Sequence, residues 1–387
     1  MMTVLFFIIP AFTPYEGGVQ RSTAKLASVF KNNGYKCLIV SLSHGKRDEW
    51  QGIPIISLKD INSKSSQVEF KAILHDYSVD VVINQMGSEL DITRFIVEAK
   101  GRKIRLVNTL RMNPLSFVQN SEYILRDKLK KENLSWLYSE ILQRVVVLYH
   151  RKKQKKVLNY ILEKVDYFIT LSPSFIPELE YYGIDTEEYN QKLLAIPNMF
   201  PAVVETKHLK SNVILYVGRL EKMQKRIDLL EEIFRRLHSR MIDWEFWVVG
   251  DGPDKKGFEE YCQMHKLERL KFFGYQDPTP FYQKAKLLAF TSGNEGFGNV
   301  LIEAQQHEVV PVMFNSYSAA PDLVKDGKTG KLIKPFNVDE YVNEVLELAQ
   351  NVERLEQYAQ EGKEHARAFE YEAISKRWFD LLQEMKS

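Results

Sequence analysis

The chain has 387 residues, of which 44% are hydrophobic and 27% are charged, and its formal net charge is +2 at pH 7. This length is sufficient for two domains of ordinary size, and the composition excludes a disordered chain. The two cysteines, Cys37 and Cys262, lie far apart and outside any metal-ligand spacing. This excludes a disulfide framework and favours a reducing, cytoplasmic compartment.

Charge is distributed unevenly between the two halves of the chain. Residues 1–200 contain 27 Lys and Arg against 21 Asp and Glu, whereas the remainder contains 26 against 30. A net charge of +6 in the first half favours an anionic partner there, such as a membrane surface or a phosphorylated acceptor. The chain has no recognisable nucleic-acid-binding motif, so we expect no nucleic-acid partner.

The first half alternates short apolar runs with amphipathic stretches. The apolar N-terminal segment lacks a basic region, which favours a buried strand over a signal peptide. No segment approaches the ~20 apolar residues that a membrane helix needs. The predicted strands are Val4–Ile9, Cys37–Leu42, Val79–Asn84, Ile104–Asn108 and Tyr167–Leu171, with helices at Val19–Lys31, Val68–Tyr77 and Asp91–Lys100.

One basic segment, residues 121–164, interrupts this pattern with 11 Lys and Arg against 5 Asp and Glu and with apolar clusters beside the cations. One interpretation is a basic amphipathic helix on an anionic membrane surface, which would place the protein at the inner face of the cell membrane. The alternative is a solvated helix that covers the first domain.

The pattern restarts after a proline-containing linker at Ile196–Pro201, followed by the polar stretch Glu205–Asn212. Continuous apolar strands alternating with helices predict α/β architecture with parallel sheets covered on both faces. We therefore expect two doubly wound domains that face a cleft. The second set of strands is Val213–Val217, Glu245–Val249, Leu270–Phe273, Leu287–Phe290 and Val309–Phe314, with helices at Ile227–His238, Gly257–His265 and Val300–His307, and a helical tail from Val338.

The strongest candidate site is the segment Ser292–Ala304, where a strand ends, a glycine-containing loop follows and a helix begins. Gly296 and Gly298 allow the backbone to approach a ligand, and the helix N-terminus favours anionic or oxygen-rich groups. Glu295 and Glu303 can accept hydrogen bonds from sugar and ribose hydroxyls. The alternative is one capping and one solvated glutamate, and spacing alone leaves both open.

These residues resemble the signature of the retaining GT-B glycosyltransferases of family four. Glu295 and Glu303 form a Glu-x7-Glu motif within Glu-Gly-Phe-Gly-Asn-Val-Leu-Ile-Glu-Ala. The resemblance extends in order over residues 213–340 through Tyr216–Leu220 with Lys225, Val248–Pro253, Phe273–Tyr275 and Asp326–Gly330. It implies a GT-B fold whose last helix crosses back to the first domain. It also implies that the donor is bound by Gly296, Phe297, Gly298, Asn299, Val300 and Glu303.

Two cations follow the first strand of the second domain. Arg219 and Lys225 resemble the family's diphosphate clamp and would stabilise the departing phosphate. The chain contains no Asp-x-Asp motif or histidine cluster for a metal, so we expect metal-independent activity. The alternative is a surface pair beside a helix.

The remaining candidates lie elsewhere in the chain. Gly17 and Gly18 lie between the first strand and the first helix, where the resembled family approaches the donor diphosphate and the acceptor. The alternative is a plain turn. Arg111 is the best match for a histidine that many relatives carry near the reacting sugar, and an arginine cannot act as a general base at neutral pH. Tyr275 is expected against the base and Asn198 near the phosphates, with ordinary packing as the alternative for both.

The resemblance implies a hexosyltransferase that uses a nucleotide sugar, preferably a UDP-sugar, and a glycan or polyprenyl-linked acceptor in bacterial surface polysaccharide synthesis. The alternatives are a sugar-nucleotide epimerase of the same fold and a non-catalytic donor-binding subunit. The expected domains are 1–197 with a C-terminal helix at about 370–387, and 198–369.

Overall fold

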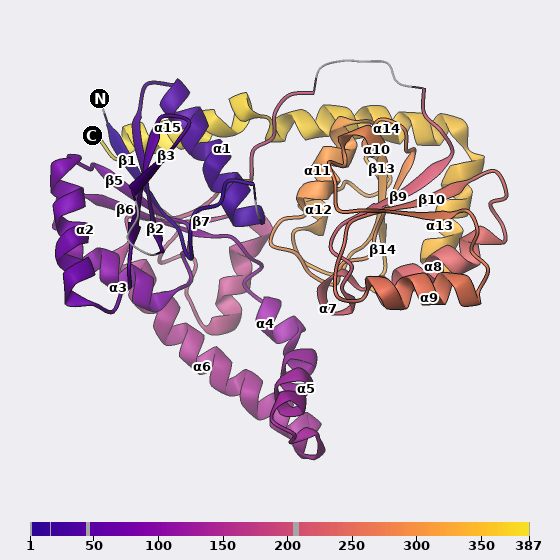
Figure 1. Cartoon of the computed structure of the whole chain (residues 1–387), viewed down its shortest axis with the longest axis horizontal. Coiled ribbons are helices and arrows are strands. Elements are labelled where there is room, and N and C mark those ends of the chain that lie inside the picture. Colours follow the sequence, from indigo (N-terminus) through magenta and orange to yellow (C-terminus); the bar gives the residue numbers. More distant parts are fainter. Residues whose placement is uncertain (1, 16, 44–46, 204–208, 387) are drawn as a thin grey trace. The chain divides into compact units, whose positions relative to one another are not determined.

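The computed structural model describes residues 2–15, 17–43, 47–203 and 209–386. The chain forms two compact units, and both are α/β with predominantly parallel sheets, as predicted (Figure 1). Unit 1 consists of Met1–Leu115, Leu137–Met199 and Tyr371–Ser387. Unit 2 consists of Ser116–Trp136 and Phe200–Glu370. Part of the predicted linker, residues 204–208, lies outside the described residues.

Unit 1 contains an eight-stranded sheet with the order β3-β4-β2-β1-β5-β6-β7-β8. Its strands are β1 (Thr3–Phe7), β2 (Lys36–Leu42), β3 (Arg47–Trp50), β4 (Ile53–Leu58), β5 (Val81–Asn84), β6 (Arg105–Leu110), β7 (Tyr167–Thr170) and β8 (Leu193–Ala195). Its helices are α1 (Gly18–Asn32), α2 (Lys64–Asp76), α3 (Leu90–Ala99), α6 (Glu140–Lys164) and α15 (Tyr371–Glu384).

The hairpin β3–β4 was not predicted, and it makes the sheet mixed, because β3 pairs antiparallel with β4. Trp50 pairs with Ile53 across a two-residue turn, and both turn residues, Gln51 and Gly52, have positive φ. Turns of this kind match the twist of a hairpin. Pattern reading missed β3 because an edge strand of mostly polar residues carries no apolar run.

Alternate residues of β1 point to opposite faces of the sheet, as the strand repeat requires. Val4 and Phe6 pack with α1 and α15 in one hydrophobic cluster. Phe7 points the other way and contacts Phe70 of α2 and Phe95 of α3, at centroid distances of 5.6 and 6.0 Å. Because both faces of the strand are buried, its sequence is a continuous apolar run, and this pattern predicted the strand.

The C-terminal helix α15 belongs to unit 1, which confirms the predicted crossing back to the first domain. Trp378 lies in the cluster of β1 and α1, with its ring 6.0 Å from that of Phe30. Phe379 stacks on Tyr35 at 5.3 Å. The helix thus completes a core whose other members all lie within residues 2–199.

Unit 2 contains a six-stranded parallel sheet with the order β11-β10-β9-β12-β13-β14. Its strands are β9 (Val213–Val217), β10 (Glu245–Val249), β11 (Leu270–Gly274), β12 (Leu287–Phe290), β13 (Val310–Phe314) and β14 (Lys331–Ile333). Its helices are α4 (Ser116–Gln119), α5 (Ser121–Lys131), α7 (Lys222–Lys225), α8 (Ile227–His238), α9 (Lys255–Met264), α10 (Thr279–Tyr282), α11 (Asn299–Gln306), α12 (Ala320–Leu323), α13 (Val338–Gln350) and α14 (Val352–Ala366).

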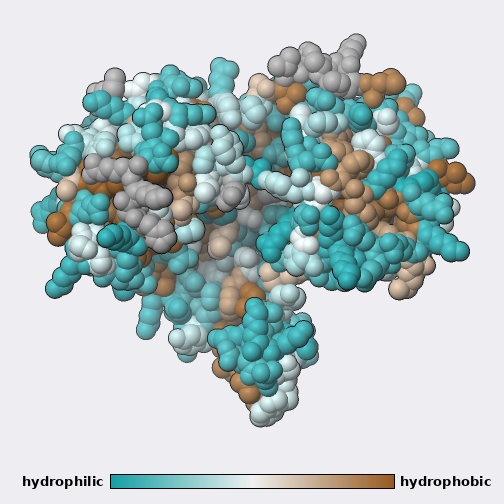
Figure 2. Space-filling view, viewed as in Figure 1, coloured by the Kyte–Doolittle hydropathy of each residue, from teal (hydrophilic) through white to brown (hydrophobic). Residues whose placement is uncertain are grey.

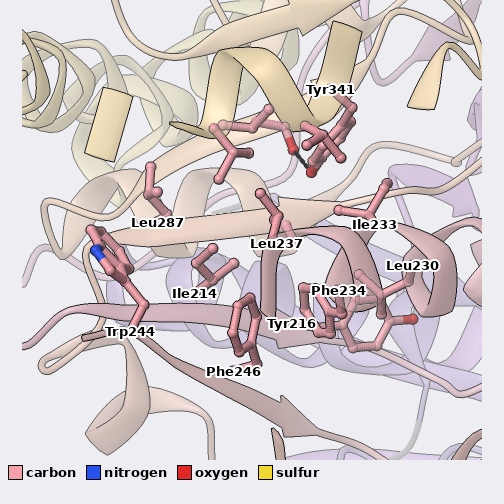
Figure 3. Packing of buried hydrophobic residues seen from close by; sticks show 14 of the residues in the cluster. Ile214, Tyr216, Leu230, Ile233, Phe234, Leu237, Trp244, Phe246, Leu287 and Tyr341 are labelled. Atoms are coloured by element: carbon pink, nitrogen blue, oxygen red, sulfur yellow. Dashed lines mark hydrogen bonds between the residues drawn. The ribbon is translucent and has the colours of Figure 1, made fainter. Parts of the chain in front are cut away.

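The core of unit 2 lies between the sheet and helices that include α8 and α13 (Figure 3). Ile214 and Phe246 of the sheet pack with Phe234 of α8. Tyr341 of α13 donates its hydroxyl hydrogen to the Val312 carbonyl, so its polar atom is satisfied inside the core.

Segment Ser116–Trp136 groups with unit 2, whereas the sequence placed it inside 1–197. It contributes no strand to either sheet. The domain limits expected from the sequence rest on the pattern of strands. That pattern gives no information about where a segment without strands packs.

We expect Trp378→Ala to destabilise unit 1 by about 3–5 kcal/mol, the usual cost of emptying a large aromatic site in a packed core. The check is hydrogen exchange in β1 and β2, which should accelerate. Lys376→Ala, an exposed change on the same helix, is the matched control. Unchanged exchange in these strands would mean that α15 does not support the core of unit 1.

Candidate functional site

In both units the strand order reverses beside the first strand, and Gly17, Gly18, Arg219, Lys225 and Glu295 follow strands at these two points. In unit 2 the sheet departs in opposite directions from β9, with β10 on one side and β12 on the other. The connections after β9 and β12 lead to Lys225 and Glu295. Ligands of doubly wound sheets bind at this place, outside the carboxyl ends of the strands.

Lys225 and Glu295 form a direct ion pair, and both side chains are largely buried. Two further bonds hold their loops together: the Gly293 amide donates to the Gln224 carbonyl, and the Thr291 hydroxyl donates to the Lys225 carbonyl, both at 2.8 Å. Buried charges are stable when they are paired in this way. The structure thus brings together the predicted phosphate-binding lysine and the predicted sugar-binding glutamate.

Helix α11 begins directly after this loop. Gly298 is its N-cap and has φ 94°, a left-handed conformation that favours glycine. A Cβ at Gly298 would lie 3.0 Å from the Tyr317 hydroxyl, so the site also lacks space for a side chain. Phe297 is buried against Phe369, whereas Gly296 is partly exposed. Asn299 and Val300 form the first turn of the helix, and a helix N-terminus favours an anionic or oxygen-rich ligand.

Glu303 lies on α11 and is partly exposed. The Tyr282 hydroxyl donates to its carboxylate at 3.2 Å. Burial raises the pKa of Tyr282 well above its ordinary value, so the hydroxyl keeps its proton and remains a donor. This bond orients the Glu303 carboxylate and leaves lone pairs for further hydrogen bonds.

Arg219 is exposed and pairs with Glu221 at 3.2 Å. The position of its backbone is set by close contact between loops, because a Cβ at Gly250 would lie 1.9 Å from the Gly218 carbonyl oxygen. Gly250 therefore has to be glycine for the ends of β9 and β10 to meet. Tyr275, which follows β11, is exposed.

In unit 1, Gly17 is the N-cap of α1 with φ 68°, and Gly18 is the first residue of that helix. A Cβ at either glycine would meet no atom of the described residues within 4 Å, so these residues leave the space before the helix open. The preceding residue, Glu16, lies outside the described residues. Open backbone amides at a helix N-terminus suit a phosphate.

Arg111 and Asn198, predicted separately, are in contact. The Arg111 guanidinium donates to the amide oxygens of Gln85, at 2.7 Å, and of Asn198, at 3.1 Å. Burial lowers the pKa of Arg111 to about 10, so the group stays protonated at neutral pH. It can donate hydrogen bonds and supply positive charge, but it cannot accept a proton.

Three residues of these sites were not predicted from the sequence. Gln85 follows β5 and holds Arg111, and its buried side-chain nitrogen has no hydrogen-bond partner in the described part of the chain. The Gln224 amide donates to the Asn294 carbonyl at 3.2 Å. The hydroxyl of buried Tyr317 likewise has no partner among the described residues. Gln85 could have been found as a polar residue at the end of a buried strand beside the switch point.

Among the described residues, no group of three or more His, Cys, Asp and Glu side chains is placed to hold a metal ion. In the same part of the chain, none of the helices combines the length and hydropathy required to cross a bilayer.

Comparison with solved structures identifies the fold as GT-B. HepE from Anabaena, solved in complex with UDP and glucose, superimposes with a TM-score of 0.73 over 99% of this chain and 100% of its own, at 17% sequence identity. The likeness covers both units.

Residues 202–365 match the family described as glycosyl transferases group 1. This match covers most of unit 2, and the candidate residues from Arg219 to Glu303 lie within it.

Two curated relatives are each 27% identical to this chain over a segment that covers 59% of it. One is the GalNAc-alpha-(1->4)-GalNAc-alpha-(1->3)-diNAcBac-PP-undecaprenol alpha-1,4-N-acetyl-D-galactosaminyltransferase of Campylobacter jejuni. The other is the poly(ribitol-phosphate) alpha-N-acetylglucosaminyltransferase of Staphylococcus aureus. The matched segments span 66% and 46% of these relatives.

We expect Lys225→Met to destabilise ligand-free unit 2 by about 3–5 kcal/mol, because it leaves Glu295 buried without its partner. Glu295→Gln should recover part of this loss in the double variant. A double-mutant cycle by denaturant unfolding measures the coupling. Strictly additive effects would mean that the ion pair contributes nothing to the loop arrangement.

Proposed function

We propose that this protein is a retaining glycosyltransferase. It moves a hexose or N-acetylhexosamine from a nucleotide sugar, with UDP-sugars preferred, to a glycan or polyprenyl-linked saccharide in bacterial surface polysaccharide synthesis. The observation that carries the proposal is the buried Lys225–Glu295 pair before the N-terminus of α11. It lies inside the glycosyl transferases group 1 domain.

The relatives support the substrate classes. HepE was solved with UDP and glucose, which favours a uridine nucleotide donor. The Campylobacter relative is named for an undecaprenol diphosphate saccharide and the Staphylococcus relative for poly(ribitol-phosphate). Both names specify an N-acetylhexosamine transferred in alpha linkage. A retaining enzyme that uses the usual α-linked UDP-sugars would form this linkage.

In this proposal, unit 2 binds the donor. Lys225 and Arg219 hold the diphosphate, one as a compact charge and the other as a planar fork. Glu295 accepts hydrogen bonds from the transferred sugar, and Glu303 accepts them from the ribose. The amides of residues 296–300 approach the phosphates, and Tyr275 lies against the base.

During transfer, the bond between the anomeric carbon and the phosphate oxygen breaks as the acceptor oxygen bonds to that carbon. The acceptor hydroxyl proton passes to the departing phosphate oxygen on the same face of the sugar. The cations that hold the diphosphate stabilise its developing charge without a metal, which is the largest demand of this step.

Unit 1 supplies the acceptor side. Gly17 and Gly18 expose helix amides to a phosphate, and Arg111 donates hydrogen bonds to the sugar or the acceptor. Asn198 and Gln85 hold the Arg111 guanidinium in place, so its orientation does not depend on the ligand.

The test is incubation of the protein with a panel of nucleotide sugars and saccharide acceptors. Glu295→Ala should lower kcat by about 10²–10³-fold with donor binding only partly weakened, because its contact stabilises the reacting sugar. Glu303→Ala should instead raise the donor KM, because ribose contacts are mostly uniform binding.

Glu295→Gln, which keeps the side-chain volume, separates loss of charge from loss of structure. A normal kcat in both Glu295 variants would remove this residue from the reaction. Release of an epimerised nucleotide sugar, with no transfer to any acceptor, would identify an epimerase. Donor binding without turnover would identify a non-catalytic subunit.

Activity should persist in EDTA, because Lys225 and Arg219 supply the positive charge that a divalent ion would otherwise provide. The measurement is the initial transfer rate before and after chelation. Loss of activity in EDTA and its recovery with Mg²⁺ or Mn²⁺ would overturn the metal-independent mechanism.

A further inference from the structure

Helix α6 has two different environments along its 25 residues. Its C-terminal half is anchored in unit 1, where Val157, Leu158, Ile161 and Leu162 are buried. Its N-terminal half extends away from the sheet of unit 1 (Figure 1). The first half is therefore not required for the core of unit 1.

The exposed half carries large apolar side chains on one face. Ile141, Val145, Leu148 and Tyr149 are 74%, 55%, 55% and 70% exposed. Their spacing of four, three and one residues places them within one helical stripe. Leu137, at the end of the 3-10 helix before α6, is 39% exposed and adds to this apolar surface. Hydrophobic surface is visible among hydrophilic surface on the projecting part of the chain (Figure 2).

Directly after the apolar stripe, the helix becomes strongly basic. Arg151, Lys152, Lys153, Lys155 and Lys156 occupy two turns, and no Asp or Glu occurs between residues 141 and 162. Lys152 and Lys156 follow Leu148 and Tyr149 at helical spacing, so they extend the same face. An exposed apolar stripe thus ends in a cluster of cations.

We propose that α6 docks the protein on an anionic lipid bilayer, with the apolar stripe of Leu137–Tyr149 inserted among the acyl chains near the headgroups and Lys152–Lys156 at the lipid phosphates. The distance from Val145 to Lys152 along the axis is about 10 Å. Interfacial helices bury an apolar face at the boundary between headgroups and acyl chains, and nearby cations add attraction to anionic lipids.

Charge decides between the bilayer and a second copy of the chain. A copy that paired along this face would bring an identical group of cations, and α6 offers no carboxylate between residues 141 and 162 to neutralise it. Anionic lipids neutralise the cations while their acyl chains cover the apolar stripe. The proposal does not depend on glycosyl transfer.

The test is flotation of the full-length protein with vesicles of phosphatidylcholine alone or mixed with phosphatidylglycerol. The protein should float with the mixed vesicles and remain unbound with phosphatidylcholine alone. Ile141→Ser/Leu148→Ser should lower the partition coefficient by about 10-fold or more. Lys152→Glu/Lys156→Glu should produce a similar loss, and raised salt should weaken binding of the parent chain.

Matched controls are Val68→Ser and Lys64→Glu/Lys71→Glu on α2, which change equally exposed residues of unit 1 and should leave flotation unchanged. Circular dichroism verifies that each variant is folded. Equal binding of the α6 variants and the parent chain would overturn the proposal. So would a concentration-dependent oligomer that Ile141→Ser/Leu148→Ser dissociates without any effect on vesicle binding. Transfer to a water-soluble acceptor should be unchanged in the α6 variants, which separates this proposal from the catalytic one.

Discussion

The ion pair between Lys225 and Glu295 joins the two loops from which the candidate donor site is built. Each of these side chains would be costly to bury alone, and together they satisfy one another in a largely desolvated position. In the proposed function, the same charges bind the donor, with the lysine on the diphosphate and the glutamate on the sugar. The site is therefore held in shape before the ligand arrives, and donor binding replaces one set of charge contacts with another.

This pairing depends on where the parallel sheet changes direction. The chain leaves β9 on one side and returns as β12 on the other, so the loops after the two strands open at the same edge. Gly250 permits the ends of β9 and β10 to approach within backbone contact, and Gly298 supplies the conformation from which α11 begins. The geometry of unit 2 thus explains why glycine occupies positions 250 and 298.

Unit 1 uses a different arrangement of polar groups. Arg111, the sequence-based match for a histidine of the resembled family, has as its two partners the neutral amide oxygens of Gln85 and Asn198. Among the described residues it has no ion pair, so its positive charge stays available to a ligand. In the proposed function, the arginine supplies charge and hydrogen bonds in place of a titrating base, and the departing phosphate accepts the proton.

The sequence by itself determined the α/β class, the two sheets and the apolar face of the C-terminal helix, because continuous apolar strands and helical stripes are local patterns. It also identified the Glu295–Glu303 segment, since a strand, a glycine loop and a helix N-terminus follow one another directly. Only the tertiary structure decided that Lys225 pairs with Glu295 and that Gln85 holds Arg111. These contacts join residues 70 and 26 positions apart, and their distances are set by strand order rather than by any local preference.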